Sequence, residues 1–483
     1  MPIWKTKALS SVADINPQKL KVIERSPDSD VHFVPMAAVT EEYGGIDIGA
    51  TRKLKDVVKG YTQFAADDVL FAKITPCMEN GKVAVAPELP LGIGYGSTEF
   101  HVIRPSSDVR SRWIAYFLSR ADTRSEARRN MTGSAGQLRV PTKWLDELKL
   151  PVPSLEIQDS VLALVDEQLS DLDAGVAGLA RAQANLKRYR ASLLNAAMEG
   201  RLTADWRVNN PATETGGQLL TRILKERREN WEANQIAKFS AKGKQLPTNW
   251  QRKYEEPVAP DAKNLPELPT GWCWATLEQL AGLITSGSRG WAQYYSDSGP
   301  IFIRSQDING DFLNIESVAH VSPPQDSEGG RTRVLLADLL ITITGANVAK
   351  CAEVTFSPDE AYVSQHVALV RPVWPKTSRY LHTCLVCDSH GRRQLLKFAY
   401  GAGKPGLNLQ QVSSVAIPLP PLAEQMRIGE LLDEQLATQS KVAVELERQV
   451  KRAGQLRQSI LKAAFAGTLA SEKQTSVVSE QAA

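Results

Sequence analysis

Apolar residues between positions 155 and 200 recur in steps that alternate between three and four residues. This heptad pattern is typical of a long α-helix that packs one apolar stripe against another helix. The apolar positions of this first stripe are Leu162, Val165, Leu169, Leu172, Val176 and Leu179, followed by Leu186 and Leu193.

A second stretch repeats the first at a constant offset of 267 residues. "LVDEQL" at 164–169 returns as "LLDEQL" at 431–436, and 18 of the 53 residues in 150–202 match their counterparts without a gap. A repeat this long indicates a duplicated domain-sized unit rather than a solenoid. The second stripe consists of Leu432, Leu436, Ala443, Leu446, Val450, Ala453 and Ile460.

Both stretches carry start and stop signals for a helix. "PVPS" (151–154) and "PLPP" (418–421) precede them, and proline can begin a helix but not continue one. Gly200 and Gly467 follow, in the position where glycine ends many helices. Some 45 residues at 1.5 Å each predict helices of about 65–70 Å.

The two predicted helices should pair with each other as an antiparallel coiled coil. Gly175 and Gly178 would each destabilise an isolated first helix by roughly 1 kcal/mol, so this helix should need a partner. The alternative is that each amphipathic helix covers only its own domain.

The segments upstream of the two helices also resemble each other. "DDVLFAKITPCMENGKVAVAPE" (67–88) resembles "ADLLITITGANVAKCAEVTFSPD" (337–359), and helical patterns follow each of them, at 112–129 and 379–399. This mixture predicts the α+β fold class, in two halves related by internal pseudo-two-fold symmetry. The predicted segments are α+β domains at 1–153 and 266–421, helices at 154–202 and 422–469, a linker at 203–265, and a disordered tail at 470–483.

The linker is basic and helical before it becomes rich in proline. Nine lysines and arginines face three glutamates between Arg222 and Lys253. A basic helix most often forms a solvated face, and the alternative is contact with nucleic acid or a protein partner.

The composition leaves many function classes open. The 483 residues are 42% hydrophobic with a net charge of +3, which neither demands nor excludes a nucleic-acid partner. Five scattered cysteines argue against a disulfide framework. No apolar run approaches the roughly 18 residues of a membrane span, so we expect a cytoplasmic protein without membrane contact.

Catalytic and metal-binding motifs fail on inspection. "GAGKPG" (401–406) resembles a phosphate loop, but its spacing is wrong and Pro405 stands where Ser or Thr is needed. Cys384, Cys387 and His390 lack a second nearby Cys/His pair, so we expect buried cysteines and no metal. With no catalytic constellation, the chain is predicted to be a recognition protein and not an enzyme.

The order of these features resembles the specificity subunit of type I DNA restriction–modification systems. The resemblance covers nearly the whole chain: "P-x-P-x-L…Q" before each helix, "LL-x-A-A/F…G-x-L" near its end, "GRLTADWR" (200–207), and "LPELPTGWCWATLEQL" (265–280) opening the second half. It implies two target-recognition domains, each reading one half of a split, asymmetric double-stranded DNA site, separated by the family's pair of conserved helices.

The same resemblance implies the partners and their chemistry. Two modification subunits would methylate adenine with S-adenosylmethionine, and restriction subunits would translocate and cleave DNA with ATP and Mg²⁺. This chain would bind none of these cofactors itself. The alternatives are a fused methyltransferase–nuclease, opposed by the missing methylation signature, and a coiled-coil adaptor that binds only proteins.

Candidate DNA contacts lie in loops and strand ends that carry polar or basic side chains, the groups that bind bases and phosphates. Three glycine-containing loops stand out, at 132–139, 285–291 and 400–408, although each could be a plain glycine turn. The candidates are Lys73, Asn80, Lys82, Ser134, Gln137 and Arg139 in the first domain, and Ser286, Ser288, Arg289, Asn347, Lys350, Lys404 and Asn408 in the second.

Overall fold

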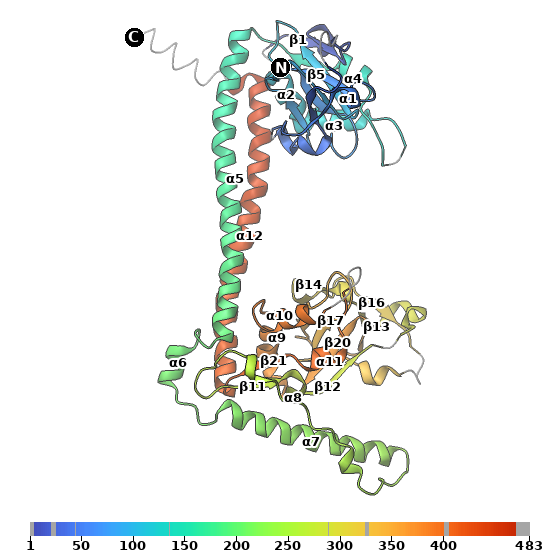
Figure 1. Ribbon diagram of the computed structural model, residues 1–483, viewed down its shortest axis with the longest axis vertical. Helices are drawn as coiled ribbons and strands as arrows, with labels where there is room; N and C mark the ends of the chain where they lie inside the picture. Colours follow the sequence, from blue (N-terminus) through green and yellow to red (C-terminus); the bar gives the residue numbers. More distant parts are fainter. Residues whose placement is uncertain are drawn as a thin grey trace. The chain divides into compact units, whose positions relative to one another are not determined.

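Two helices of 44 and 45 residues dominate the computed structural model, α5 (Leu155–Met198) and α12 (Leu422–Ala466). Figure 1 shows them side by side. They confirm the two predicted long helices, and Gly200 and Gly467 follow their ends with positive φ angles of 69° and 79°. The structure describes residues 4–20, 26–43, 45–134, 136–287, 289–323, 328–399 and 405–469. The predicted tail, Ser288 and Lys404 lie outside these residues.

The chain forms two units, and each contains one end of the helix pair. Unit 1 comprises residues 1–182 with 445–483, and unit 2 comprises residues 183–444. In unit 1 the beginning of α5 packs with the end of α12, whereas in unit 2 the end of α5 packs with the beginning of α12. The two helices are therefore antiparallel.

Domain 1, the α+β part of unit 1, is built on two four-stranded sheets. Their strand orders are β2-β9-β6-β7 and β4-β3-β8-β5, and β1 pairs with β10. The strands are β1 Thr6–Ala8, β2 Ala13–Ile15, β3 Asp30–Val34, β4 Thr51–Lys53, β5 Thr62–Ala65, β6 Val69–Ala72, β7 Val83–Val85, β8 Ile93–Gly96, β9 Phe100–Pro105 and β10 Lys149–Pro151. The helices are α1 Leu54–Val57, α2 Ser111–Ser119, α3 Ala121–Arg129 and α4 Thr142–Glu147.

Domain 2, the α+β part of unit 2, repeats the first of these sheets. Its four-stranded sheet has the order β12-β20-β17-β18, and β11-β21, β16-β13-β19 and β14-β15 complete the strand pairing. The strands are β11 Cys273–Thr276, β12 Ala281–Ser286, β13 Tyr295–Ile303, β14 Ile308–Asn309, β15 Phe312–Leu313, β16 Ala319–Val321, β17 Leu339–Thr342, β18 Cys351–Glu353, β19 Ala361–Val363, β20 Val367–Pro372 and β21 Ala416–Leu419. The helices of unit 2 outside the long pair are α6 Ala204–Asn209, α7 Gly216–Ala241, α8 Leu277–Leu280, α9 Ser378–Val386, α10 Gly391–Phe398 and α11 Leu409–Ser413.

The glutamine of the repeated proline motif has the same structural role in both halves. Gln158 and Gln425 are both buried, and each donates from Nε2 to a proline carbonyl five residues earlier, at 2.9 Å. These bonds join the proline turn to the first turn of the long helix. The motif therefore marks the point where each domain passes into its helix.

A buried ion pair also recurs. Arg104 binds Asp68 through two hydrogen bonds of 2.8 and 2.7 Å, and Arg371 binds Asp338 through two of the same lengths. Both carboxylates are 1% exposed. A buried carboxylate needs such a partner, so each pair fixes the turn before β6 or β17 to the end of β9 or β20.

The end of α12 completes the core of domain 1. Phe465 packs its ring against Trp113 and Phe117 of α2, with centroid distances of 4.6 and 5.2 Å. In the same core, Val161 and Leu169 of α5 are buried. Domain 1 thus depends on residues more than 300 positions away in sequence.

A buried carboxylate joins three segments of unit 2. Glu424, near the start of α12, accepts hydrogen bonds from Thr203 Oγ1 at 2.6 Å, Arg207 Nη2 at 2.7 Å and Trp272 Nε1 at 2.9 Å. Its side chain is only 2% exposed. These donors come from the chain after α5 and from the start of domain 2, so Glu424 fixes both to the helix.

The predicted seam residues differ in burial along the helices. Leu162, Val165, Leu169, Leu432 and Ile460 are buried, at 8% exposure or less. Leu172, Val176, Leu179, Leu436 and Leu446 are half-buried, and Val450 is 38% exposed. The seam is tightest where α5 and α12 also contact a domain.

The basic composition of the linker favoured a solvated helix, but part of the linker is buried. Leu219 and Ile223 of α7 are buried in the core of unit 2, because α7 begins against α8, β11 and β12. Among the helices of the described residues, none combines the length and apolar composition that crossing a bilayer requires.

Phe465→Ala should destabilise unit 1 by about 3–5 kcal/mol, because the lost ring leaves a cavity beside Trp113 and Phe117. Hydrogen exchange measured by mass spectrometry should show faster exchange in α2 and its sheet, with little change in residues 273–419. Val444→Ala, on the same helix at 66% exposure, should change stability by less than about 0.5 kcal/mol. Equal loss of protection in both units would contradict this packing.

Candidate nucleic-acid interface

Two of the predicted loops are attached to their domains by backbone hydrogen bonds at equivalent positions. In domain 1, Val140 N donates to Lys73 O at 2.8 Å and Thr75 N to Leu138 O at 3.0 Å. We call residues 132–139 loop 1 and residues 400–408 loop 2.

Loop 2 of domain 2 has the equivalent attachment. Leu407 N donates to Ile343 O at 2.8 Å, and Gly345 N donates to Pro405 O at 3.1 Å. The loop residues are offset by 267 and the strand-end residues by 270, as in the sequence repeat. The structure thus places loop 1 and the described end of loop 2, residues 405–408, beside equivalent strand ends, those of β6 and β17.

Loop 1 presents polar side chains at its tip. Thr132 and Arg139 exchange two backbone hydrogen bonds of 2.9 Å at its base, while Ser134 and Gln137 are exposed. Gly133 has a φ of 130°, and a Cβ there would meet Gln137 O at 2.8 Å, so this turn requires glycine. The tip can therefore offer a hydroxyl and an amide to a neighbouring molecule.

The base of loop 1 carries a charged cluster. Arg139 binds Glu99 through two hydrogen bonds of 2.9 and 2.8 Å, with the two side chains 40% and 25% exposed. The hydrogen bonds from Arg139 lower the pKa of Glu99, and the charge of Lys73 lowers it further. Arg139 is thus held in place, and Lys73 supplies excess positive charge nearby.

His101 joins loop 1 to the sheet. Its Nε2 lies 2.8 Å from Val140 O, and its Nδ1 lies 3.0 Å from Asn16 Nδ2. Because a carbonyl oxygen only accepts, Nε2 carries the proton and Nδ1 accepts from the amide. Burial lowers the pKa of His101, which favours this neutral form.

Asn80 and Lys82 instead brace the neighbouring loop of domain 1. Asn80 donates to Glu41 Oε1 at 2.8 Å, and Lys82 donates to Met36 O at 3.2 Å. Their counterparts in domain 2 make similar contacts: Asn347 with Ser305 O and Lys350 with Asn309 Oδ1, both at 3.4 Å. The structure therefore places these four residues in turns after β6 and β17.

The remaining candidates of domain 2 fall into two places. Asn408 caps α11, since its Oδ1 accepts from Gln411 N at 2.8 Å. Ser286 lies in β12 opposite Ala368, and Arg289 is exposed just beyond that strand.

The sequence reasoning missed Glu99 as the partner of Arg139 and did not assign His101 a role. His101 opens "HVIRP" (101–105), but the matching segment of the second half, "ALVRP" (368–372), has Ala368 in place of the histidine, so the repeat did not mark this residue. His366 is exposed, and its Nδ1 lies 2.7 Å from Thr344 Oγ1.

The cysteines carry no sign of metal chemistry in the described part of the chain, where no group of three His, Cys, Asp or Glu residues could hold a metal ion. Cys384 and Cys387 are fully buried, which confirms the expectation from sequence, and all five cysteines are free thiols. Burial raises the pKa of both thiols, so neither is an activated nucleophile.

Comparison with known proteins gives a consistent result. A family model described as the type I restriction modification DNA specificity domain matches residues 2–174 and 335–451, more than half of the chain. The specificity subunit of the type I restriction enzyme EcoAI from Escherichia coli is 26% identical over 486 residues, covering 91% of this chain and 78% of that protein.

A second relative and one solved structure extend the comparison. The EcoEI specificity subunit from Escherichia coli is 29% identical over 326 residues, covering 59% of this chain and 51% of that protein. A solved structure from work on complex assembly and conformational transition of the type I R-M system has a TM-score of 0.68 at 18% identity. That alignment covers 96% of this chain and 98% of the other, and it shows a shared fold.

The protonation of His101 should make loop 1 sensitive to pH. Burial holds the pKa of His101 below its usual value of 6.5, so its contribution to stability is complete above about pH 6.5 and is lost as the pH falls through the folded pKa. After correction for intrinsic exchange rates, residues 132–140 should exchange faster at pH 5.5 than at pH 7.5.

His101→Gln should remove most of this difference, because the amide does not titrate. Equal protection of loop 1 at both pH values in the unmodified protein would contradict the assignment.

Proposed function

The chain belongs to the family of type I restriction–modification DNA specificity subunits, and we propose that it reads a split, asymmetric duplex target. The observation that carries this proposal is the repeated attachment of loops 1 and 2 to equivalent strand ends, with different side chains in each. Equivalent backbones with unlike side chains suit two half-sites of different sequence.

Each domain would use its loop together with the charged groups at the loop base. Exposed amide and hydroxyl groups such as Gln137 and Ser134 can bind base edges, while Lys73 and Arg139 supply positive charge for phosphates. In domain 2 we assign the same role to the region of Ser286, Ser288, Arg289, Lys404 and Asn408. Because Arg139 is bound to Glu99, it would serve first to hold loop 1 and second to contact DNA.

The helix pair would set the separation of the half-sites. A helix of 44 residues is about 66 Å long. Two half-sites that are read from one face of DNA are separated by one helical turn, about 34–36 Å, or by a multiple of it. A pair of packed helices is stiffer than a flexible linker, so the length of α5 and α12 would determine the number of base pairs between the two half-sites.

The helix pair also offers contact surface for protein partners. Tyr189 of α5 is 50% exposed, and α12 exposes apolar side chains along its length: Met426, Val442, Val444, Val450 and Leu456, each at 38% or more. Such side chains gain from burial in an interface. We assign this surface to two modification subunits.

Catalysis would belong to the partners of this chain. Modification subunits would bring S-adenosylmethionine for adenine methylation, and restriction subunits would bring ATP and Mg²⁺ for translocation and cleavage. We place the complex in the cytoplasm. The interpretation of the chain as a protein-only adaptor gains no support, because the matching family model describes a DNA specificity domain.

A genome-wide map of N6-methyladenine, with and without the gene for this chain, tests the proposal. Deletion should remove one split, asymmetric motif from the map. Gln137→Ala should weaken or broaden methylation in one half of that motif, because a bidentate base contact contributes about 1–3 kcal/mol of discrimination.

The matched control is Gln183→Ala, which removes an exposed amide from α5 and should leave the motif intact. An unchanged map after deletion, with the partner subunits expressed, would contradict the proposed function. Loss of both half-sites in Gln137→Ala would contradict the assignment of loop 1.

A further inference from the structure

Helix α7 begins as part of the core of domain 2 and then borders a groove. Leu219 and Ile223 are fully buried, but none of the described α7 residues after Ile223 is. Figure 1 shows α7 running below β11, α8 and β12. A groove of about 930 Å³ is lined by this second part of α7 on one side and by residues 330–338 and 371–375 on the other.

The groove wall formed by α7 is held in place. Arg227 donates from Nε to Ala281 O at 3.0 Å and from Nη1 to Tyr254 Oη at 2.7 Å. Trp231 stacks on Trp250 with centroids 5.8 Å apart and meets Tyr254 edge-on at 5.3 Å. Four of the α7 residues that line the groove, Arg227, Trp231, Asn234 and Lys238, recur in steps of three and four and so lie on one helix face.

The groove has an excess of positive charge. Its lining contains Arg227, Lys238, Arg331 and Arg371 but one acid, Asp338, which is already bound to Arg371. Within the described residues, neither Arg227 nor Arg331 forms an ion pair; Arg227 binds neutral oxygens, and Arg331 binds the Thr285 hydroxyl. Among the described residues, Arg227, Lys238 and Arg331 therefore have no acidic partner within ion-pair distance.

Apolar side chains lie beside these charges. Leu335 and Leu336, in the turn before β17, are 44% and 53% exposed, and Trp231 lines the opposite wall. Covering exposed leucines in a groove that also contains an aromatic ring makes the free energy of binding more favourable. The groove thus combines the two features that bind a segment with both acidic and apolar side chains.

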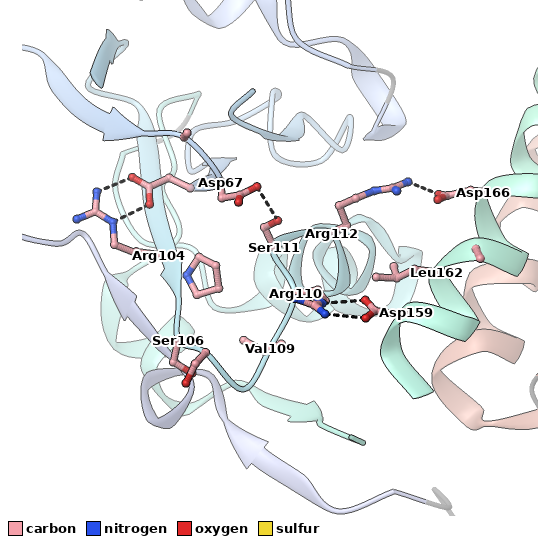
Figure 2. A pocket seen from close by; sticks show the side chains of 15 residues that line it. Asp67, Arg104, Ser106, Val109, Arg110, Ser111, Arg112, Asp159, Leu162 and Asp166 are labelled. Atoms are coloured by element: carbon pink, nitrogen blue, oxygen red, sulfur yellow. Dashed lines mark hydrogen bonds and ion pairs between the residues drawn. The ribbon is translucent and has the colours of Figure 1, made fainter. Parts of the chain in front are cut away.

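The equivalent place in domain 1 serves as an internal comparison. A pocket of about 600 Å³ is lined by the equivalent pair, Asp68 and Arg104. Figure 2 shows that there Asp159 and Asp166 of α5 bind Arg110 and Arg112. The lining of this pocket holds four acids, Asp67, Asp68, Asp159 and Asp166, against three arginines, so it has no excess of positive charge. The recurring Asp–Arg pair is structural in both halves, and of these two sites only the α7 groove has an excess of positive charge.

We propose that the α7 groove binds an acidic, leucine-bearing segment of a partner subunit in the assembled complex. Charge complementarity and the exposed leucines select this occupant. Duplex DNA is a poorer fit, because its phosphates offer nothing apolar to cover Leu335 and Leu336. The inference rests on the proposed function, since it takes the partner from the same complex.

Site-specific photo-crosslinking in the reconstituted complex tests the inference. The probe p-benzoylphenylalanine replaces Leu336 inside the groove or, as a control, Val258, which is 71% exposed and is not among the groove residues. The complex contains this chain, its modification and restriction subunits and target DNA, and methylation of the target is measured in parallel. Cross-linked peptides are identified by mass spectrometry.

The Leu336 probe should cross-link to one partner segment rich in Asp, Glu and Leu, and the Val258 probe should not. Lys238→Glu should reduce that cross-link at least fivefold. The control Lys225→Glu makes the same charge change on the same helix, at a side chain that is 77% exposed and outside the groove, and should leave the yield unchanged.

Two results overturn the inference alone: a complex that methylates its target but gives no Leu336 cross-link above the Val258 level, or a cross-link to DNA or to a basic segment. Failure of the complex to methylate any target would instead overturn the proposed function, and this inference with it.

Discussion

The packing of α5 against α12 is the constraint on which both halves of the chain depend. Each helix contributes side chains to two cores: α5 gives Val161 and Leu169 to unit 1 and Ala197 to unit 2, whereas α12 gives Leu432 to unit 2 and Phe465 to unit 1. Neither domain can complete its core without the distant helix. Folding therefore couples the two α+β domains to one helix pair, and this pair must form for either domain to be stable.

The parts that recur between the halves are structural, and the parts that differ are exposed. The buried glutamines, the Asp–Arg pairs and the backbone bonds under loops 1 and 2 are shared. Loop 1 offers Ser134 and Gln137, while the described end of loop 2 offers the helix cap Asn408. Duplication of the frame with divergence of the loops is a simple way to read two unlike half-sites with one chain.

The heptad pattern and the two glycine stops predicted the long helices within a few residues, because both signals are local and repeated. Contacts between residues far apart in sequence were less accessible. Nothing local marks Glu99 as the partner of Arg139, or Asn16 as the partner of His101. Likewise, the basic composition of α7 hid the two apolar residues that anchor it in unit 2. Val450 occupies a seam position of the heptad pattern but is exposed. The pattern predicts which face of the helix packs, but not which part of that face a domain also covers.

Changing the length of the scaffold tests the account most directly. Seven residues inserted into both α5 and α12 keep the heptad phase and lengthen the pair by about 10.5 Å, the length of about three base pairs. The account predicts that the methylated motif keeps both half-site sequences and gains a spacer that is longer by up to about three base pairs. Altered half-site sequences, or an unchanged spacer in an active complex, would contradict it.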